Sequence, residues 1–248
     1  MKTIKLLLIA ITTLFFMSGC YDYLEDEYLG EYYKDSAFNV VNMKVGSDTE
    51  MAMYFDDDNY PIIDYRYNYS ESIDYDLHLL NNTFAEIYLQ DRYNNGFSSG
   101  FLQRESQTML IFGADVYDEE LNIIPQVRIF ENKPPQHNNA VNINIINALP
   151  TEEFSNFLPY LGFESTLFLE VNGYRVSNSI DYMQNDRFII DGVDYSSDFV
   201  TVTLVLSDGS ALMYDLHLRN GHSYNLVIGH YNNSLLSEPT IYMYDVSY

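Results

Sequence analysis

The chain has 248 residues and carries 36 acidic against 12 basic side chains, which gives a formal net charge of −24 at pH 7. A surface this acidic repels phosphate backbones and anionic headgroups, so the charge argues against nucleic-acid binding and against membrane adhesion through the protein itself. Cys20 is the only cysteine, so the fold has no internal disulfide and must be held together by burial.

The first 19 residues have the layout of a secretory signal. Lys2 and Lys5 supply positive charge, residues 6–16 are apolar, and small residues lead to Cys20. The apolar stretch is too short to span a bilayer. The run Met17-Ser18-Gly19-Cys20 resembles the lipobox of bacterial lipoproteins, and the resemblance implies removal of residues 1–19 and lipidation of Cys20. An ordinary cleaved signal with a chance cysteine is the alternative.

Lipid on Cys20 would make the membrane a partner of this chain. Each buried CH₂ group contributes about 0.8 kcal/mol, so two or three acyl chains anchor a protein stably. Residues 20–35 then form an acidic, flexible tether, and the mature chain has 10 basic and 36 acidic residues, a net charge of −26. Acidic residues behind the acylated cysteine resemble the surface-export signals of some Gram-negative lipoproteins. We therefore expect a lipid-anchored outer-membrane protein exposed at the cell surface, with a periplasmic orientation as the alternative.

Residues 36–132 contain short runs rich in Val, Ile, Tyr, Phe and Thr, which predict strands. Tyr65, Tyr67 and Tyr69 recur at a spacing of two, so on a strand they share one face. Tyrosine combines an aromatic face with a hydroxyl group, which suits recognition of sugars or proteins. These three residues are our candidates for a binding stripe. The alternative is that tyrosine serves as the large, half-buried residue of a sandwich strand.

Two groups of residues contain side chains that bind metals, but neither group has the spacing of a metal site. Asp56-Asp57-Asp58-Asn59 with Asp64 offers oxygen ligands for Ca²⁺ but lacks the spacing, central glycine and distant glutamate of a helix-loop-helix site, which favours a solvated hairpin tip. His217, His222 and His230 lie on or beside neighbouring predicted strands, but no Cys or His-x-x-x-His spacing supports Zn²⁺. We predict no metal and no cofactor.

The last third of the chain gives the clearest strand signals. Residues 199–206 alternate apolar even positions with other residues, and Asp208-Gly209 predicts a two-residue hairpin into residues 211–218. Asn220-Gly221 predicts a second turn, into residues 223–228. The sequence therefore predicts three consecutive antiparallel strands here.

An internal repeat predicts how the chain is divided. Residues 125–131 match residues 239–245 at an offset of 114, residues 109–113 match 225–229 at an offset of 116, and Asn95-Gly96 matches Asp208-Gly209 at an offset of 113. Three matches in the same order favour duplication over chance similarity between strands. We expect one β unit at residues 36–132, a linker at 133–139 and a second β unit at 140–248.

Each unit has the size and rhythm of an immunoglobulin-like sandwich. The second unit opens with a strand that ends Asn147-Ala148-Leu149-Pro150, continues with Val171-Asn172-Gly173, and closes with Gly221-His222-Ser223-Tyr224. This order resembles a domain-of-unknown-function family of secreted bacterial proteins, which implies a β domain and no particular activity. The predicted fold is all-β, with two tandem immunoglobulin-like antiparallel sandwiches.

No Gly-x-Ser-x-Gly elbow or other catalytic signature appears in the sequence. We therefore predict a non-enzymatic protein of the cell envelope, a surface binding or adhesion module for a glycan or a protein. A structural or accessory subunit of an envelope complex or surface appendage is the alternative.

Overall fold

The computed structural model describes residues 33–46, 49–55, 63–80, 85–91, 96–102, 106–114, 123–149, 166–191, 199–206, 209–234 and 237–247. Every regular element in these ranges is a β-strand, which confirms the all-β prediction. None of these residues belongs to a helix long and apolar enough to cross a membrane.

Two halves follow one another along the chain. The strands of the first half are β1 (Tyr33–Asn42), β2 (Thr49–Phe55), β3 (Ile63–Tyr67), β4 (Ser72–Leu80), β5 (Ala85–Asp91), β6 (Gly96–Leu102), β7 (Gln107–Ala114) and β8 (Ile123–Glu131). Those of the second are β9 (Ala140–Asn147), β10 (Thr166–Val171), β11 (Tyr174–Arg175), β12 (Ile180–Asp181), β13 (Asn185–Asp191), β14 (Val200–Leu206), β15 (Ala211–Leu216), β16 (Ser223–His230) and β17 (Pro239–Asp245).

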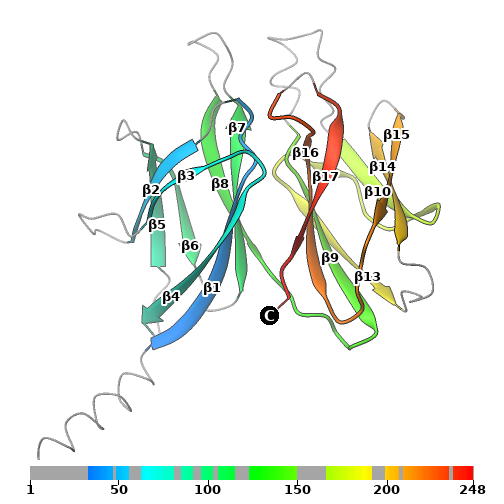
Figure 1. The fold of residues 1–248 in the computed structure, drawn as a ribbon, viewed down its shortest axis with the longest axis horizontal. Coiled ribbons are helices and arrows are strands. Elements are labelled where there is room, and N and C mark those ends of the chain that lie inside the picture. The colour runs from blue at the N-terminus through cyan, green and yellow to red at the C-terminus, as the bar shows by residue number, and fades with distance from the viewer. Residues whose placement is uncertain are drawn as a thin grey trace, which may run out of the picture.

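Each half consists of two sheets with the same strand order (Figure 1). The first half has sheets β4-β1-β7-β8 and β3-β2-β5-β6, and the second has sheets β13-β9-β16-β17 and β11-β10-β14-β15, with β12 also paired to β10. Two pairs depart from the predicted antiparallel pattern, because β1 and β7 run parallel, as do β9 and β16. A parallel pair needs a long connection, and here the intervening strands of each half supply it.

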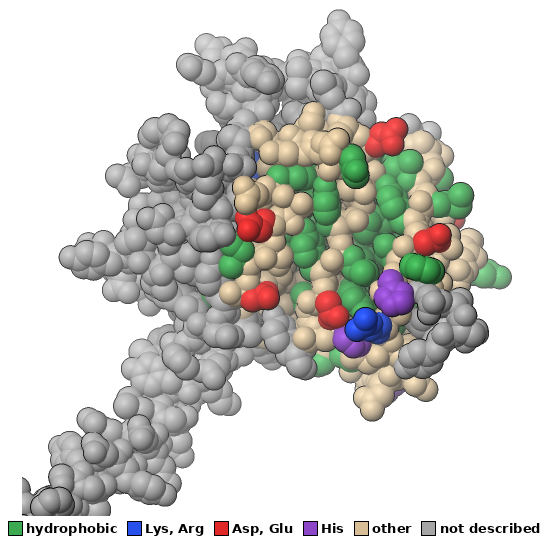
Figure 2. Space-filling view, in the orientation of Figure 1, with side chains coloured by type: hydrophobic (Ala, Val, Ile, Leu, Met, Phe, Trp, Pro, Cys, Tyr) green, Lys and Arg blue, Asp and Glu red, His purple; other side chains and the backbone are tan. Residues whose placement is uncertain are grey.

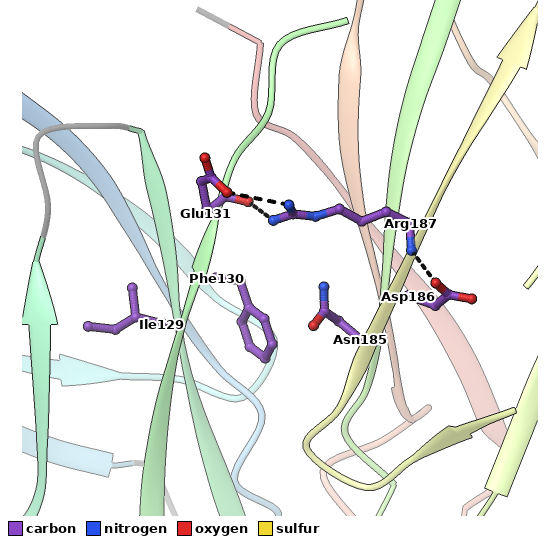
Figure 3. A pocket seen from close by; sticks show the side chains of 6 residues that line it. All are labelled: Ile129, Phe130, Glu131, Asn185, Asp186 and Arg187. Carbon is purple, nitrogen blue, oxygen red and sulfur yellow. Dashed lines mark hydrogen bonds and ion pairs between the residues drawn. The ribbon is translucent and has the colours of Figure 1, made fainter. Parts of the chain in front are cut away.

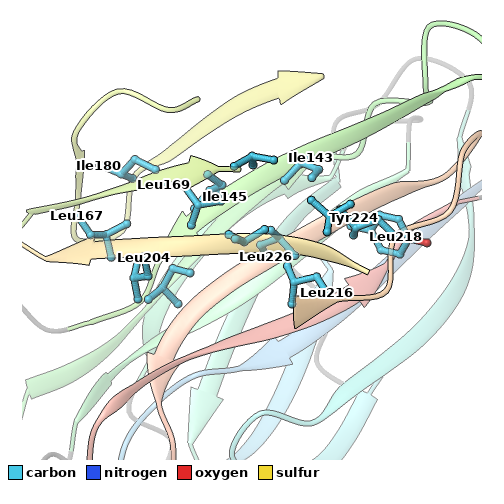
Figure 4. Close-up of a cluster of buried hydrophobic side chains, with 14 of the residues drawn as sticks. Ile143, Ile145, Leu167, Leu169, Ile180, Leu204, Leu216, Leu218, Tyr224 and Leu226 are labelled. Atoms are coloured by element: carbon cyan, nitrogen blue, oxygen red, sulfur yellow. The ribbon is translucent and has the colours of Figure 1, made fainter. Parts of the chain in front are cut away.

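The core of the second half lies between its two sheets (Figure 4). Val200, Val202, Leu204 and Leu206 of β14 point into this core and are buried, whereas the residues between them are half-buried. The alternation predicted for residues 199–206 is therefore confirmed. From β9 and β16, residues such as Ile145 complete the same core.

A second core lies between the two halves, where sheet β4-β1-β7-β8 packs on sheet β13-β9-β16-β17. Its buried members come from both halves: Val41, Met43, Leu110, Phe112, Phe130, Ile146, Ala148, Met183 and Val227. Strands β9 and β16 lie between the two cores and are buried almost throughout on both faces. We call this contact the junction.

The turns of the second half differ in part from prediction. β14 and β15 pair as predicted, but Leu206 N–H donates to the carbonyl of Ser210 at 2.9 Å, so the turn is longer than two residues, with Gly209 at a φ of 84°. A left-handed glycine that closes a three-residue connection is a common hairpin solution. The predicted three-strand run is wrong at its last step, because β16 pairs with β9 and β17. After β15 the chain crosses to the other sheet, and the buried Leu218 lies on this crossing.

The backbone shows that the two halves repeat one plan. Ser70, with a φ of 59°, donates its N–H to the carbonyl of Asn42 at 2.7 Å. Met183, with a φ of 60°, donates its N–H to the carbonyl of Asn147 at 2.8 Å. These two turns, each of which holds a non-glycine residue in the left-handed region, occupy the same place in the strand order.

Strand pairing fixes the offsets between equivalent residues. Thr108 pairs with Asn39 and with Phe130, while Asn225 pairs with Asn144 and with Tyr244. The offset from β8 to β17 is therefore 114, as the sequence repeat indicates, but that from β7 to β16 is 117 and not 116. Neighbouring residues of a strand face opposite sides, so a shift of one residue exchanges the two faces. The predicted domain boundaries at 132, 133–139 and 140 stay a prediction, since the halves share the junction core.

Candidate functional site

A groove opens at one side of the junction, between the edge strand β8 of the first half and the edge strand β13 of the second. It has two adjoining cavities, of about 420 and 340 Å³, and Arg187 lines both. The first is lined by Ile129, Phe130, Glu131, Asn185, Asp186 and Arg187. The second is lined by Lys133, Pro134, Gln136, Asn142, Arg187, Phe188 and Ile189. Pockets of a few hundred Å³ are of the size that binds small ligands.

Arg187 bridges the two halves across the groove (Figure 3). Its guanidinium donates a hydrogen bond to the backbone carbonyl of Glu131 and lies 3.5 Å from the Glu131 carboxylate. Lys133 Nζ lies 3.4 Å from the same carboxylate. The side chains of Arg187 and Glu131 are 28% and 39% exposed, so the pair is open to solvent. Either side chain can leave its partner and bind a ligand instead.

Neighbouring residues fix the position of Arg187 on β13. The Arg187 N–H donates to Asp186 Oδ1 at 2.8 Å, and Asp186 Oδ2 accepts from the N–H of Asn178 at 2.7 Å and from Asn178 Nδ2 at 3.0 Å. Asn185 donates from Nδ2 to Asn144 Oδ1 at 2.6 Å. The backbone from which Arg187 extends is thus tied to the interior of the second half.

The second cavity combines apolar surface with amides. Phe188 packs partly against the core of its own half, Ile189 is 38% exposed, and Asn142 donates from Nδ2 to the carbonyl of Lys133 at 2.7 Å. Arg offers only donors, Glu offers only acceptors, and amides offer both. Such a lining can hydrogen-bond groups that donate and accept, such as sugar hydroxyls or peptide units, while the apolar surface contacts carbon.

The opposite side of the junction is chemically different. By strand pairing, Asp74 stands where Arg187 stands in the second half, and Asp245 stands where Glu131 stands in the first. Burial opposes ionisation of Asp245, but hydrogen bonds from Ser247 and His222 outweigh it and hold the pKa of this carboxyl below its usual range. The arginine bridge therefore has no counterpart at the equivalent place.

Hydrophobic side chains run in rows over the second half on the face in Figure 2, with acidic side chains scattered singly among and around them. Where the side chains on this face are described, acidic groups do not gather into one patch. No group of three or more His, Cys, Asp or Glu side chains that could hold a metal ion occurs within the described ranges.

Most of the residues named from the sequence fall outside the description or apart from the groove. Cys20 and the run Asp56-Asp57-Asp58-Asn59 lie outside the described residues. Tyr65 and Tyr67 lie on β3, but the structure does not describe their side chains. Tyr69 lies in the turn after β3, half-buried at the junction. The binding stripe stays a prediction.

Tyr69 makes specific contacts with the second half. Its hydroxyl lies 2.8 Å from the N–H of His230 and 2.9 Å from the His230 carbonyl, and its ring meets that of Tyr242 edge-on with centroids 6.0 Å apart. Burial raises the pKa of Tyr69 far above its usual range. The three histidines have separate neighbours: His217 lies beside Phe199, His222 pairs with Asp245, and the ring of His230 bonds the carbonyl of Ser237.

Sequence reasoning missed the groove. Glu131 belongs to the repeat, but Arg187 belongs to none of the repeat matches or motifs. The two residues are 56 positions apart in the sequence. The only available signal was that Glu131 ends the repeated strand two residues before the start of the predicted linker at 133–139.

Comparisons with known proteins give little further guidance. No family model and no curated protein matches the chain. Among solved structures, the CBM26 module of Eubacterium rectale Amy13K in complex with maltoheptaose is 14% identical with a TM-score of 0.24, over 84% of this chain and 96% of that one. A Bacteroides ovatus protein named for a proposed role in cell adhesion is 12% identical with a TM-score of 0.23, over 86% and 98%. Similarity at this level carries no argument about function.

Proposed function

We propose that this chain is a non-enzymatic, lipid-anchored protein of the outer membrane that binds a glycan or a protein at the cell surface. Residues 1–19 are the lipoprotein signal, Cys20 carries the lipid, and residues 20–35 are the tether. The observation that carries the binding function is the groove at the junction, in which Arg187 reaches from one half to Glu131 of the other.

The lining of the groove suits binding rather than catalysis. Its cations, Arg187 and Lys133, both face the carboxylate of Glu131, and its amides are oriented by neighbouring carbonyls. None of the described residues that line either cavity is a Ser, Cys or His, so they form no histidine-activated nucleophile. The two carboxylates among them are already engaged, Glu131 by Arg187 and Asp186 by Asn178. Open clefts that combine a few polar groups with apolar surface are typical of ligand sites.

Binding by the full, detergent-extracted chain to a glycan array, and pull-down of surface proteins, tests this function. Arg187→Ala removes the bridge and should weaken capture of the ligand at least about tenfold, as for a residue central to an interface. Arg219→Ala is the matched control, because Arg219 is exposed, lies outside the groove and carries the same charge.

Two results would contradict the proposal: no ligand of either class, or a ligand whose binding the Arg187 and Arg219 variants weaken equally. Co-purification of the chain in a stable membrane complex would instead support the accessory-subunit alternative.

A further inference from the structure

A continuous series of hydrogen bonds, buried at its centre and exposed at both ends, crosses the junction. Each member donates to the next, in the order Asn185, Asn144, Asn225, Thr108, Asn39 and Ser72, over distances of 2.6, 2.9, 2.6, 2.5 and 3.2 Å. Thr108 and Asn225 are 0% and 1% exposed. Asn132 Oδ1 lies within 2.9 Å of Thr108 Oγ1 and 3.1 Å of Asn225 Nδ2 and supplements this contact. We call the series the amide chain.

The amide chain uses equivalent positions in both halves. Strand pairing makes Asn39 equivalent to Asn144, Ser72 equivalent to Asn185, and Thr108 equivalent to Asn225. The central contact, between Thr108 and Asn225, therefore joins two equivalent positions. That is the mark of a two-fold interface, in which one surface patch packs on its own copy.

The apolar contacts around the amide chain repeat the same relation. A Cβ on Gly229 of the second half would lie 2.9 Å from the hydroxyl of Tyr69 in the first half. At the equivalent positions, Phe112 of the first half meets Tyr182 of the second edge-on at 5.8 Å. Large and small residues change places between the two contacts. In one contact the large Met43 meets Gly229, and in the other their counterparts are the small Ala148 and the large Phe112. The junction is thus an internal dimer interface with two unlike copies.

Apolar sheet faces alone would tolerate small shifts, because hydrophobic contact has no direction. Hydrogen bonds between buried amides are directional, and a buried amide left unpaired carries the full penalty of its lost hydration. A shift of one half along the other would separate Thr108 from Asn225 and leave their amide and hydroxyl groups unpaired. A single buried asparagine fixes the register of two coiled-coil helices for the same reason.

We infer that Thr108 and Asn225 are positioning residues that hold the two halves in one register and thereby set the shape of the groove between β8 and β13. Asn185 ends the amide chain and also lines the groove, and Asn132 directly follows Glu131. This role is independent of which ligand the groove binds.

The experiment measures the distance between the two halves, because a change in stability alone would not alter it. Spin labels on Arg128→Cys of β8 and Met213→Cys of β15, both exposed positions, report this distance by double electron–electron resonance. The labels are placed in the full chain with Cys20→Ser, so that the only thiols are the introduced ones. The parent should give one narrow distance distribution.

The test compares Thr108→Val, which removes only the hydroxyl group, and Thr108→Val with Asn225→Leu, which makes the centre apolar. Both should unfold cooperatively but give a distribution about twice as wide or displaced, since apolar replacements retain packing and lose register. Thr108→Ser should restore the narrow distribution, and Thr203→Val, on the outward face of β14, should leave it unchanged. A folded Thr108→Val variant with the parent distribution overturns the inference. If the double variant does not fold, the distance distributions of Thr108→Val and Thr108→Ser decide the test.

Discussion

At the scale of single residues, Gly229 shows how tightly the junction is packed. A Cβ built there would overlap the end of the Met43 side chain and lie 2.9 Å from the Tyr69 hydroxyl. The φ angle of Gly229 is not in the left-handed region, so glycine is needed here because a side chain would not fit and not because of the backbone conformation. A methyl group would have to displace a residue of the other half.

Gly229→Ala should therefore lower the free energy of unfolding by about 1–3 kcal/mol, as overpacking of a core does. Chemical denaturation of the full chain measures this change. Met43→Ala removes the nearest obstacle and copies the residue at its counterpart, Ala148, so the double variant should lose less stability than the sum of the losses of the two single variants. Additive losses in the double variant would show that the two residues do not meet.

His230 is the buried titratable group next to the same contact. Its side chain is 6% exposed, Nδ1 lies 2.9 Å from the Ser237 carbonyl, and Nε2 has no partner among the described residues. Burial lowers the pKa of His230 despite the hydrogen bond to Ser237. Because the pKa is lower in the folded state, the unfolded chain binds a proton first, and stability is lost as the pH falls below about 6.5.

His230→Gln should remove this component of the pH dependence. Urea denaturation at about pH 7.5 and about pH 5 should show that the parent loses more stability on acidification than the variant, because only the parent takes up this proton. Equal losses in the two proteins would rule out a contribution of His230. Every other titrating group is common to both.

At the scale of strands, the sequence predicts well which residues of a strand alternate between buried and exposed faces. It predicts poorly which residues of other strands they contact. Residues 199–206 alternate because one face of β14 meets a core, and the pattern is visible without the structure. β16 is buried along its whole length, since it lies between two cores, but its run Ser223-Tyr224-Asn225-Leu226 alternates polar and apolar residues, as a strand with one exposed face does. Nothing local indicates that Asn225 meets Thr108, 117 residues away.

The repeat and its register between β8 and β17 were visible in the sequence, but its register between β7 and β16 was not. Equivalent positions hold unlike residues, with Thr108 opposite Asn225 and Phe112 at the counterpart of Gly229. An alignment that matches residue types slips by one position in β7, whereas strand pairing does not. The groove was hidden for the same reason, because Arg187 has an aspartate, Asp74, at its counterpart.

At the scale of the whole molecule, the two halves share one interior. The junction core contains buried residues of both halves, and Asn233 of the second half exchanges two hydrogen bonds with the backbone of Gly46, at 2.7 and 2.6 Å. Separation would expose that core together with the amide chain. Large interfaces of this kind couple the stabilities of the parts they join.

Calorimetric unfolding of the full chain should therefore show a single transition, with equal calorimetric and van't Hoff enthalpies. Thr203→Val, on an outward face, should leave the transition single. Two transitions that separate in urea would show that the halves unfold independently and that the junction contributes little to stability.

The proposed lipidation of Cys20 would determine where the groove meets its ligand, and mass spectrometry of the protein extracted from membranes tests it most directly. The expected result is a mature N-terminus at Cys20 whose mass exceeds that of the polypeptide by two or three acyl chains with their glycerol. An unacylated Cys20, or cleavage at another residue, would contradict the account of this chain as a lipid-anchored surface protein.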